Sequence, residues 1–324
     1  MKNTILKILS IVLIVCCVFS LVGVLSACQD SDWNNGNLKV VTTIFPEYDW
    51  TLNILGEHSK DVNIKNLLNS GSDMHSYQAS VADITYVATC DLLVYVGGES
   101  DEWVEKALKQ AKNKNMIVVK LLDVIDSVLD EAEGIEGEGD HEEEGAIDEH
   151  VWMSLKRAKI AVNAIADALK RIDADNAEAY AQNAASYCGE LDKLDAEYQQ
   201  AVSTAANSTL VVADRFPFLY LFDDYGLSYY AAFSGCSATT DPSMSTIYAL
   251  VEKVNELDAK VLIITETDDG KIASKIRELS NGKNQEILTL NSMQSIGAKD
   301  RTNEVNYLAI MQRNLEVLRK AVAK

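Results

Sequence analysis

The sequence has 324 residues, with 49 acidic and 29 basic side chains and a formal net charge of −20. So negative a chain argues against nucleic acid as a partner and makes cations the natural counter-species. Beyond an apolar leader, the chain is too long for one ordinary hydrophobic core, so we expect two domains.

The first 27 residues have the pattern of a bacterial lipoprotein signal. Lys2 and Lys7 precede an apolar run over 8–24, which is followed by Leu-Ser-Ala and then Cys28. The length would also allow an uncleaved transmembrane helix, but the Leu-Ser-Ala-Cys sequence falls where a lipobox belongs. We predict a signal peptide over 1–27, lipidation of Cys28, and a location on the outer face of the cytoplasmic membrane.

Short apolar, β-rich runs alternate with helical patterns along the rest of the chain. Strands are predicted over 38–44, 62–68, 92–96, 117–121, 209–213, 227–233, 261–265 and 286–290. Helices are predicted between or after the later strands, over 243–257 and 304–322. This alternation indicates an α/β fold with parallel sheets, divided between two lobes.

Six apolar residues spaced by four and three predict a long helix over 176–205, between the two groups of strands. They are Tyr180, Ala184, Tyr187, Leu191, Leu194 and Tyr198. Such a helix spans roughly 45 Å and could bridge both lobes as a stiff strut, although the periodicity also fits a helix packed within one lobe. The predicted organisation is a linker over 28–37, an N-terminal α/β lobe over 38–153, a helical segment over 154–206 and a C-terminal α/β lobe over 207–324.

An acidic insertion lies within the first predicted lobe. Residues 130–149 hold eleven carboxylates, four glycines and one histidine, with no lysine or arginine. Like charges and glycines keep such a segment solvated, so we predict a loop without a core of its own. It is either a solubilising loop or a low-affinity cation collector that uses His141, Glu142, Glu143 and Glu144.

Several residues that can bind a metal follow the carboxyl ends of predicted strands. They are His75, His150, Asp214, Glu266 and Asn291. Ligands of open parallel sheets bind at that edge, so two facing lobes would bring these groups to a common cleft. Histidine is the commonest protein ligand of transition metals, and this chain has only four histidines. Singly, each residue is more often structural; together they indicate a metal site between the lobes.

Three cysteines remain outside the leader and Cys28, and they show no C-x-x-C spacing: Cys90, Cys188 and Cys236. At most one disulfide is possible, and the spacing argues against a thiolate metal cage. We interpret the three as small buried hydrophobic residues.

Motifs along the whole mature chain resemble one known family, the substrate-binding lipoproteins of bacterial zinc and manganese ABC importers, which include the so-called metal-binding adhesins. Residues 40–49 (VVTTIFPEYD) are similar to the family's opening strand, and 74–77 (MHSY) to its P-H-x-Y segment. Residues 95–103 resemble its N-G-x-x-x-E-x-W pattern, and 148–152 (DEHVW) its D-P-H-V-W pattern. Residues 225–227, 241–243 and 307–314 follow in the family's order.

The resemblance implies two α/β lobes joined by a rigid helix, with one ion between them. His75 and His150 match the family's first two ligands. The third position falls on Arg215, whose guanidinium has no lone pair to donate, so Asp214 is the expected substitute. The fourth falls near Asn291, and Glu266 is the candidate to replace it.

The resemblance further implies a monomer that delivers its ion to the membrane permease of an ABC importer. Two imidazoles with carboxylates suit Zn²⁺, which we favour, and also Mn²⁺. A surface adhesin and an exported zinc hydrolase are the alternative functions. The sequence has no H-E-x-x-H or G-x-S-x-G motif, so we predict a binding protein instead of an enzyme, with no catalytic residues.

Overall fold

The computed structural model describes residues 32–131, 147–233, 236, 242–300 and 305–323. Residues 1–38 and 39–324 form two separate compact units. The first contains the short 3-10 helix η1 (Asp32–Asn34). The predicted signal peptide and Cys28 lie outside the described residues. Among the residues that are described, no helix has both the length and the apolar character needed to cross a membrane.

The first of two four-stranded sheets has the order β2-β1-β3-β4. Its strands are β1 (Leu38–Thr42), β2 (Val62–Asn66), β3 (Leu92–Tyr95) and β4 (Ile117–Lys120). Strand β3 is buried along its whole length and pairs in parallel with β1 on one side and β4 on the other. A continuous apolar run buried on both faces is typical of a central parallel strand.

Five short helices accompany this sheet: α2 (Phe45–Leu55), η2 (Gly56–Asp61), α3 (Val81–Thr89), α4 (Glu102–Leu108) and α5 (Leu121–Val124). The start of α2 explains the Thr-Ile-Phe-Pro-Glu motif. The Glu47 carboxylate accepts hydrogen bonds from the backbone N–H groups of Thr43 (2.8 Å) and Ile44 (3.2 Å). Helix α3 begins with a Ser80–Asp83 capping box. Both devices satisfy N–H groups that a helix start leaves free.

The second sheet has the order β6-β5-β7-β8. Its strands are β5 (Thr209–Val212), β6 (Ser228–Ala231), β7 (Val261–Ile264) and β8 (Glu286–Thr289). The pairs β5–β6, β5–β7 and β7–β8 are all parallel. Helices α8 (Leu219–Tyr225), α9 (Met244–Glu256), α10 (Lys271–Leu279) and α11 (Tyr307–Ala321) accompany this sheet. Every strand predicted from the sequence is therefore present, and the predicted fold class is confirmed.

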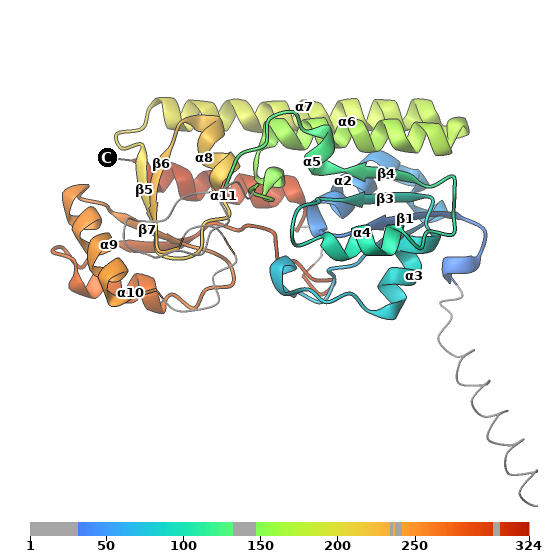
Figure 1. The fold of residues 1–324 in the computed structure, drawn as a ribbon. Coiled ribbons are helices and arrows are strands. Elements are labelled where there is room, and N and C mark those ends of the chain that lie inside the picture. Colours follow the sequence, from blue (N-terminus) through green and yellow to red (C-terminus); the bar gives the residue numbers. More distant parts are fainter. Residues whose placement is uncertain (1–31, 132–146, 234–235, 237–241, 301–304, 324) are drawn as a thin grey trace, which may run out of the picture. The chain divides into compact units, whose positions relative to one another are not determined.

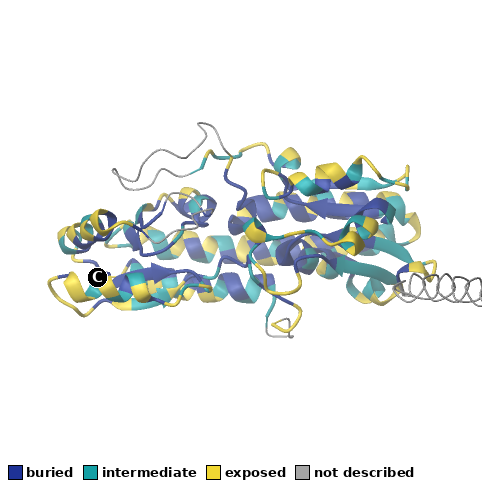
Figure 2. Cartoon of the chain, turned by 60° about the horizontal axis from the view of Figure 1, so that its bottom comes forward, coloured by how far each residue is buried: buried dark blue, intermediate teal, exposed yellow. Residues whose placement is uncertain are grey.

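A long helix, α7 (Ala177–Ser203), runs alongside both sheets and packs against α6 (Leu155–Ile172), which lies beside the first sheet (Figure 1). The short turns η4 (Val151–Met153) and η5 (Ala174–Asn176) precede α6 and α7, respectively. Helix α7 has 27 residues, about 40 Å in length. All six residues of its predicted apolar stripe are buried. It packs against α6, against α2 beside the first sheet, and against α11 beside the second. Figure 2 shows buried surface along the strands and along the inner faces of the helices.

Direct hydrogen bonds also join the elements that surround the two sheets. The Trp152 indole N–H donates to the Ser292 carbonyl at 2.8 Å, and the Tyr307 hydroxyl donates to the Trp152 carbonyl at 2.6 Å. The Tyr220 hydroxyl donates to the Asp148 carbonyl at 2.8 Å. Residues 39–324 are accordingly one compact unit. The lobe boundaries given above remain a prediction.

Candidate metal centre

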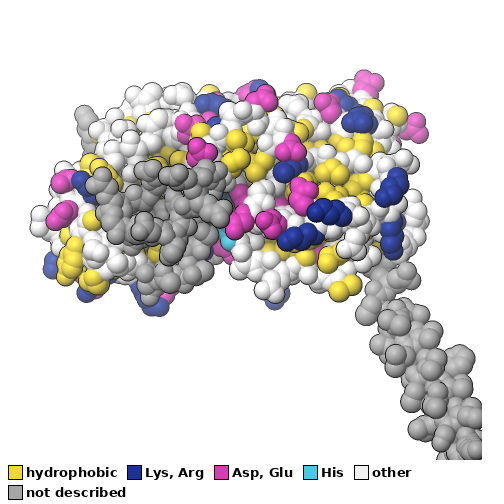
Figure 3. All heavy atoms as spheres, in the orientation of Figure 1, with side chains coloured by type: hydrophobic (Ala, Val, Ile, Leu, Met, Phe, Trp, Pro, Cys, Tyr) yellow, Lys and Arg dark blue, Asp and Glu magenta, His cyan; other side chains and the backbone are white. Residues whose placement is uncertain are grey.

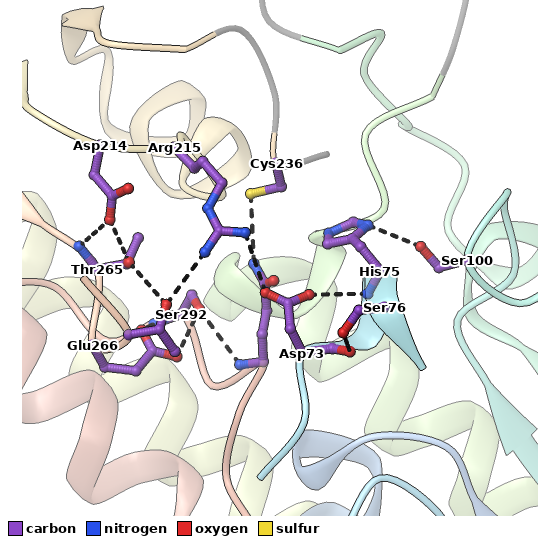
Figure 4. A network of polar contacts seen from close by, with 12 residues as sticks. Asp73, His75, Ser76, Ser100, Asp214, Arg215, Cys236, Thr265, Glu266 and Ser292 are labelled. Atoms are coloured by element: carbon purple, nitrogen blue, oxygen red, sulfur yellow. Dashed lines mark hydrogen bonds and ion pairs between the residues drawn. The ribbon is translucent and has the colours of Figure 1, made fainter. Parts of the chain in front are cut away.

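His75 lies in the loop after β2, on the 3-10 helix η3 (Met74–Ser76). The Asp73 carboxylate accepts a hydrogen bond from the His75 backbone N–H at 2.9 Å, which fixes the start of this turn. The His75 Nδ1 atom is 2.9 Å from the Ser100 Oγ, and Ser100 lies in the loop after β3 (Figure 4). This contact leaves the other ring nitrogen, Nε2, available to an ion.

His150 lies immediately before η4 and is only 2% exposed. Asp148 holds it at two points: Oδ1 accepts from the His150 backbone N–H at 2.8 Å and lies 2.9 Å from the ring Nδ1. A carboxylate on Nδ1 selects the tautomer in which Nε2 carries the lone pair. The Trp152 ring packs beside the imidazole, with 5.1 Å between ring centroids. The Asp-Glu-His-Val-Trp motif thus orients one candidate ligand.

The two imidazoles face each other through the nitrogens that remain available. Their Nε2 atoms are 3.3 Å apart. Two nitrogens bound tetrahedrally to one Zn²⁺ at about 2.1 Å lie about 3.4 Å from each other, so the pair already has a spacing that one ion can bridge. Burial and the neighbouring His150 hold the pKa of His75 well below its usual value. His75 is therefore neutral at pH 7 and keeps its lone pair.

Cys236 completes the only group of this kind among the residues that the structure describes. Its Sγ, the His75 ring and the His150 ring offer ligand atoms that all lie within 4.8 Å of one another. The side chain is 3% exposed, and Gln294 Nε2 donates to its Sγ at 3.6 Å. Burial lowers the pKa of His150, whereas the neighbouring Cys236 and Asp148 raise it. Together the two neighbours outweigh burial, so the pKa of His150 lies above its usual value. An ion that binds the His150 Nε2 must therefore displace its proton.

Sequence reasoning missed Cys236. All three described cysteines are free and buried, as predicted, but Cys236 also contacts the candidate ligands. A usable signal was present, because Cys236 follows the predicted strand 227–233 and so lies at the same edge of the second sheet as Asp214 and Glu266. The missing C-x-x-C spacing excluded a cage of thiolates, not a single thiolate beside two imidazoles.

Asp214 and Arg215 lie in the loop after β5, but neither belongs to this group. The Asp214 carboxylate is 3% exposed and accepts hydrogen bonds from the Thr265 backbone N–H (2.9 Å) and hydroxyl. The Arg215 guanidinium points toward Asp73, with 3.5 Å between Nη1 and Oδ2 (Figure 4). Its other terminal nitrogen, Nη2, is 3.4 Å from the Thr267 hydroxyl.

Glu266 and Asn291 are also engaged in hydrogen bonds at the end of the second sheet. Glu266 accepts from the backbone N–H and from the hydroxyl of Ser292, each at 2.8 Å. Burial raises its pKa above the usual value. Asn291 exchanges hydrogen bonds with the Asn314 side chain, and its own Oδ1 accepts from the Met293 N–H. These side chains fix the loops after β7 and β8.

Two further carboxyl groups support the loop after β3. Glu149 Oε1 accepts from the Ser100 N–H at 2.9 Å, and Asp101 accepts from the N–H groups of Val96 and Gly97, each at 3.0 Å. Burial raises the pKa of Asp101 to about 7. Gly98 has a positive φ of 80° and a backbone so close to Glu149 that a Cβ would clash. The Gly-Gly-Glu motif therefore positions Ser100, the partner of His75.

The acidic insertion is only partly within the described residues. His141, Glu142, Glu143 and Glu144 lie outside them, so their predicted role in ion capture remains a prediction. Asp130 and Ile147 form an isolated antiparallel bridge at the base of the insertion. On the face shown in Figure 3, acidic side chains border a small patch of histidine surface. Such a border attracts cations.

The family is decided by a match over most of the chain. A family model for the zinc-uptake complex component A, periplasmic (ZnuA), matches residues 40–321. The chain belongs to this family. The match confirms the family indicated by the histidine and glycine motifs.

The chain is similar to several proteins that are named as metal-binding proteins, and one of their crystal structures has a similar fold. The chain is 30% identical over 319 residues to the zinc-binding lipoprotein AdcA of Streptococcus pneumoniae, covering 97% of this chain and 61% of that protein. It is 27% identical over 300 residues to the high-affinity zinc uptake system protein ZnuA of Bacillus subtilis, covering 90% of each. The crystal structure of the Zn(II)-bound ZnuA-like domain of Streptococcus pneumoniae AdcA matches with a TM-score of 0.72 and 28% identity, over 89% of this chain and 100% of that one. These relatives are named as binding and uptake proteins, not as enzymes, in agreement with the predicted role.

Proposed function

We propose that this protein binds Zn²⁺ outside the cytoplasm and delivers it to an ABC importer. The observation that carries the proposal is the pair of Nε2 atoms, 3.3 Å apart, on two buried or half-buried imidazoles whose Nδ1 atoms are already held by Asp148 and Ser100. Two ring nitrogens pre-oriented toward one point are a metal-binding arrangement. The names of the zinc-binding relatives support zinc as the ion.

In this proposal His75 and His150 bind the ion directly. Asp214 and Glu266, named as ligands in the sequence analysis, instead stabilise the loops that form the wall of the site. The support for this assignment is that Thr265 and Ser292 already donate two hydrogen bonds to each carboxylate. A carboxylate that gave up those bonds to reach the ion would leave buried donors without an acceptor.

Delivery requires that the protein be held near its importer. The Leu-Ser-Ala-Cys sequence supports a lipid anchor on Cys28, and the lipoprotein name of the AdcA relative agrees with it. The partner is then the membrane permease of an ABC importer, which would receive the ion from a monomer. Because this chain spans 61% of AdcA, the activity of that whole protein is not transferred.

Calorimetric titration of the purified protein with Zn²⁺ tests the binding step. His150→Ala and His75→Ala should each lower the zinc affinity by several tenfold steps, because water replaces a lost coordinate bond poorly. The matched control is His58→Ala, since His58 is half-buried against Tyr180 outside the site. Wild-type affinity in His150→Ala would refute the proposed site.

Growth in zinc-depleted medium tests the delivery step. A strain without this gene should grow poorly there, and the wild-type gene should restore growth while the His150→Ala gene does not. A substitution of Cys28 that prevents lipidation should reduce uptake without changing zinc affinity in solution. Normal growth of the deletion strain at low zinc would separate metal binding from uptake and favour an adhesin.

A further inference from the structure

A free, buried thiol faces the two histidines, and nothing in the zinc-uptake role as proposed so far makes use of it. Cys236 lies after β6, at the edge of the second sheet, whereas His75 and His150 lie on loops that follow strands of the first sheet. The three ligand atoms lie within 4.8 Å of one another. In a tetrahedral zinc site, nitrogen and sulfur ligands lie about 3.6 Å apart, so small side-chain rotations bring all three to one ion.

The Cys236 sulfur acts as a hydrogen-bond acceptor in this structure. The Gln294 amide N–H donates to Sγ at 3.6 Å, so the sulfur already presents a lone pair to a donor. Arg215 and Asp73, which form an ion pair with each other, line the same small pocket as Cys236 and Gln294. By contrast Cys90, which is equally buried, donates its S–H to the Val87 carbonyl, as a neutral thiol does.

The other candidates for a third ligand lie outside the group formed by the two histidines and Cys236. Asp214 accepts from Thr265, Glu266 accepts from Ser292, and Arg215 has no lone pair. Among the described residues, Cys236 alone joins the two histidines in a group of metal-binding side chains.

We infer that Cys236 is the third protein ligand of the ion, and that the site therefore prefers thiophilic Zn²⁺ to Mn²⁺. The inference rests on the proposed zinc-binding function. On binding, the protons carried by the Cys236 sulfur and by the His150 Nε2 leave to solvent, and the freed lone pairs form the coordinate bonds, so that Zn²⁺ is bound by two neutral imidazoles and one thiolate. Thiolate ligands suit Zn²⁺, whereas Mn²⁺ prefers oxygen donors. A fourth position stays open to water or to another donor.

Cobalt substitution and calorimetry on the full chain, kept reduced with a phosphine, test the inference. With Co²⁺ bound, the wild type should show a sulfur-to-cobalt charge-transfer band in the near ultraviolet, and Cys236→Ser should lack it. Cys236→Ser should also lose more than about 100-fold in Zn²⁺ affinity, which exceeds the usual effect of a residue that only orients a ligand. Its Mn²⁺ affinity should change much less, so the preference for zinc falls by a similar factor.

Cys188→Ser is the matched control, because Cys188 is buried on α7 and also accepts an N–H···S hydrogen bond, from Asn163 at 3.7 Å. It should keep both the band and the affinity. A wild type that binds Zn²⁺ tightly but shows no charge-transfer band, together with unchanged affinity in Cys236→Ser, would overturn the inference and leave the proposed function standing. Failure of the wild type to bind Zn²⁺ would overturn both. The cobalt spectrum of the wild type needs no variant, so the test holds even where Cys236→Ser folds poorly.

Discussion

The Asp49→Asn substitution should stabilise the protein at neutral pH. Asp49 lies on α2 and is 8% exposed. Its Oδ2 accepts from the Tyr307 backbone N–H at 3.2 Å and from the Tyr187 hydroxyl at 3.4 Å. Helices α2, α7 and α11 therefore meet at one buried carboxyl group. Burial raises its pKa from 3.8 to about 6, although the two hydrogen bonds act in the opposite direction.

The sign of the effect follows from which state binds the proton more tightly. The folded protein holds the proton of Asp49 up to about pH 6, whereas the unfolded chain releases it near pH 3.8. The favourable contribution of this group is therefore complete below pH 3.8 and is lost as the pH rises through 6. The shift from 3.8 to about 6 corresponds to about 3 kcal/mol. Asparagine keeps an oxygen that accepts from Tyr307 and never ionises.

Urea unfolding at a series of pH values, with a chelator present so that bound metal adds no stability, measures the effect. Asp49→Asn should be more stable than the wild type by up to about 3 kcal/mol at pH 7, and the difference should shrink toward pH 4. Asp126→Asn, at an exposed aspartate, is the control and should show no such trend. A difference between Asp49→Asn and wild type that is independent of pH would refute the reasoning.

Two further predictions concern the wall of the site and the long helix. Asp214→Ala should lower the free energy of unfolding by about 1–3 kcal/mol, because the buried Thr265 N–H loses its acceptor, while calorimetry on the folded variant shows near wild-type zinc affinity. A large loss of zinc affinity in a stably folded Asp214→Ala variant would instead indicate that Asp214 binds the ion. Because α7 packs on helices beside both sheets, scattering profiles with and without Zn²⁺ should nearly superimpose while hydrogen exchange slows around His75 and His150. Marked compaction on adding zinc would exclude a stiff strut.

The fold was predictable because its signals are periodic. Most of the strands are short, apolar runs bounded by polar residues, and all eight are located within a few residues of their observed ends. The stripe from Tyr180 to Tyr198 predicts α7 for the same reason, since residues four and three apart lie on one face of a helix. What periodicity leaves open is whether α7 packs within one lobe or along both, because that depends on contacts with α2 and α11 from distant parts of the chain.

The sequence predicted where the site lies, at the carboxyl ends of the strands, but not which side chains form it. Topology brings the loops after parallel strands together, which places His75, His150, Asp214 and Cys236 in one region. It does not say which way each side chain turns. Asp214 turns to Thr265, and Cys236 turns to the histidines. Those directions depend on one-residue details of loop conformation that carry no pattern in the sequence.

The connections around His150 bear on how far the protein must move to hold an ion. Trp152, two residues after His150, donates to the Ser292 carbonyl and accepts from the Tyr307 hydroxyl, so the His150 loop is already tied to the elements beside the second sheet. The ring itself is fixed by Asp148. A wide hinge motion would have to break these buried hydrogen bonds, each of which costs about 1–3 kcal/mol when its partner is left unsatisfied. Capture by small movements of the His75 and Cys236 side chains toward a fixed His150 avoids that cost. On this reasoning an importer would distinguish the loaded form by the order of these loops more than by the separation of the two sheets.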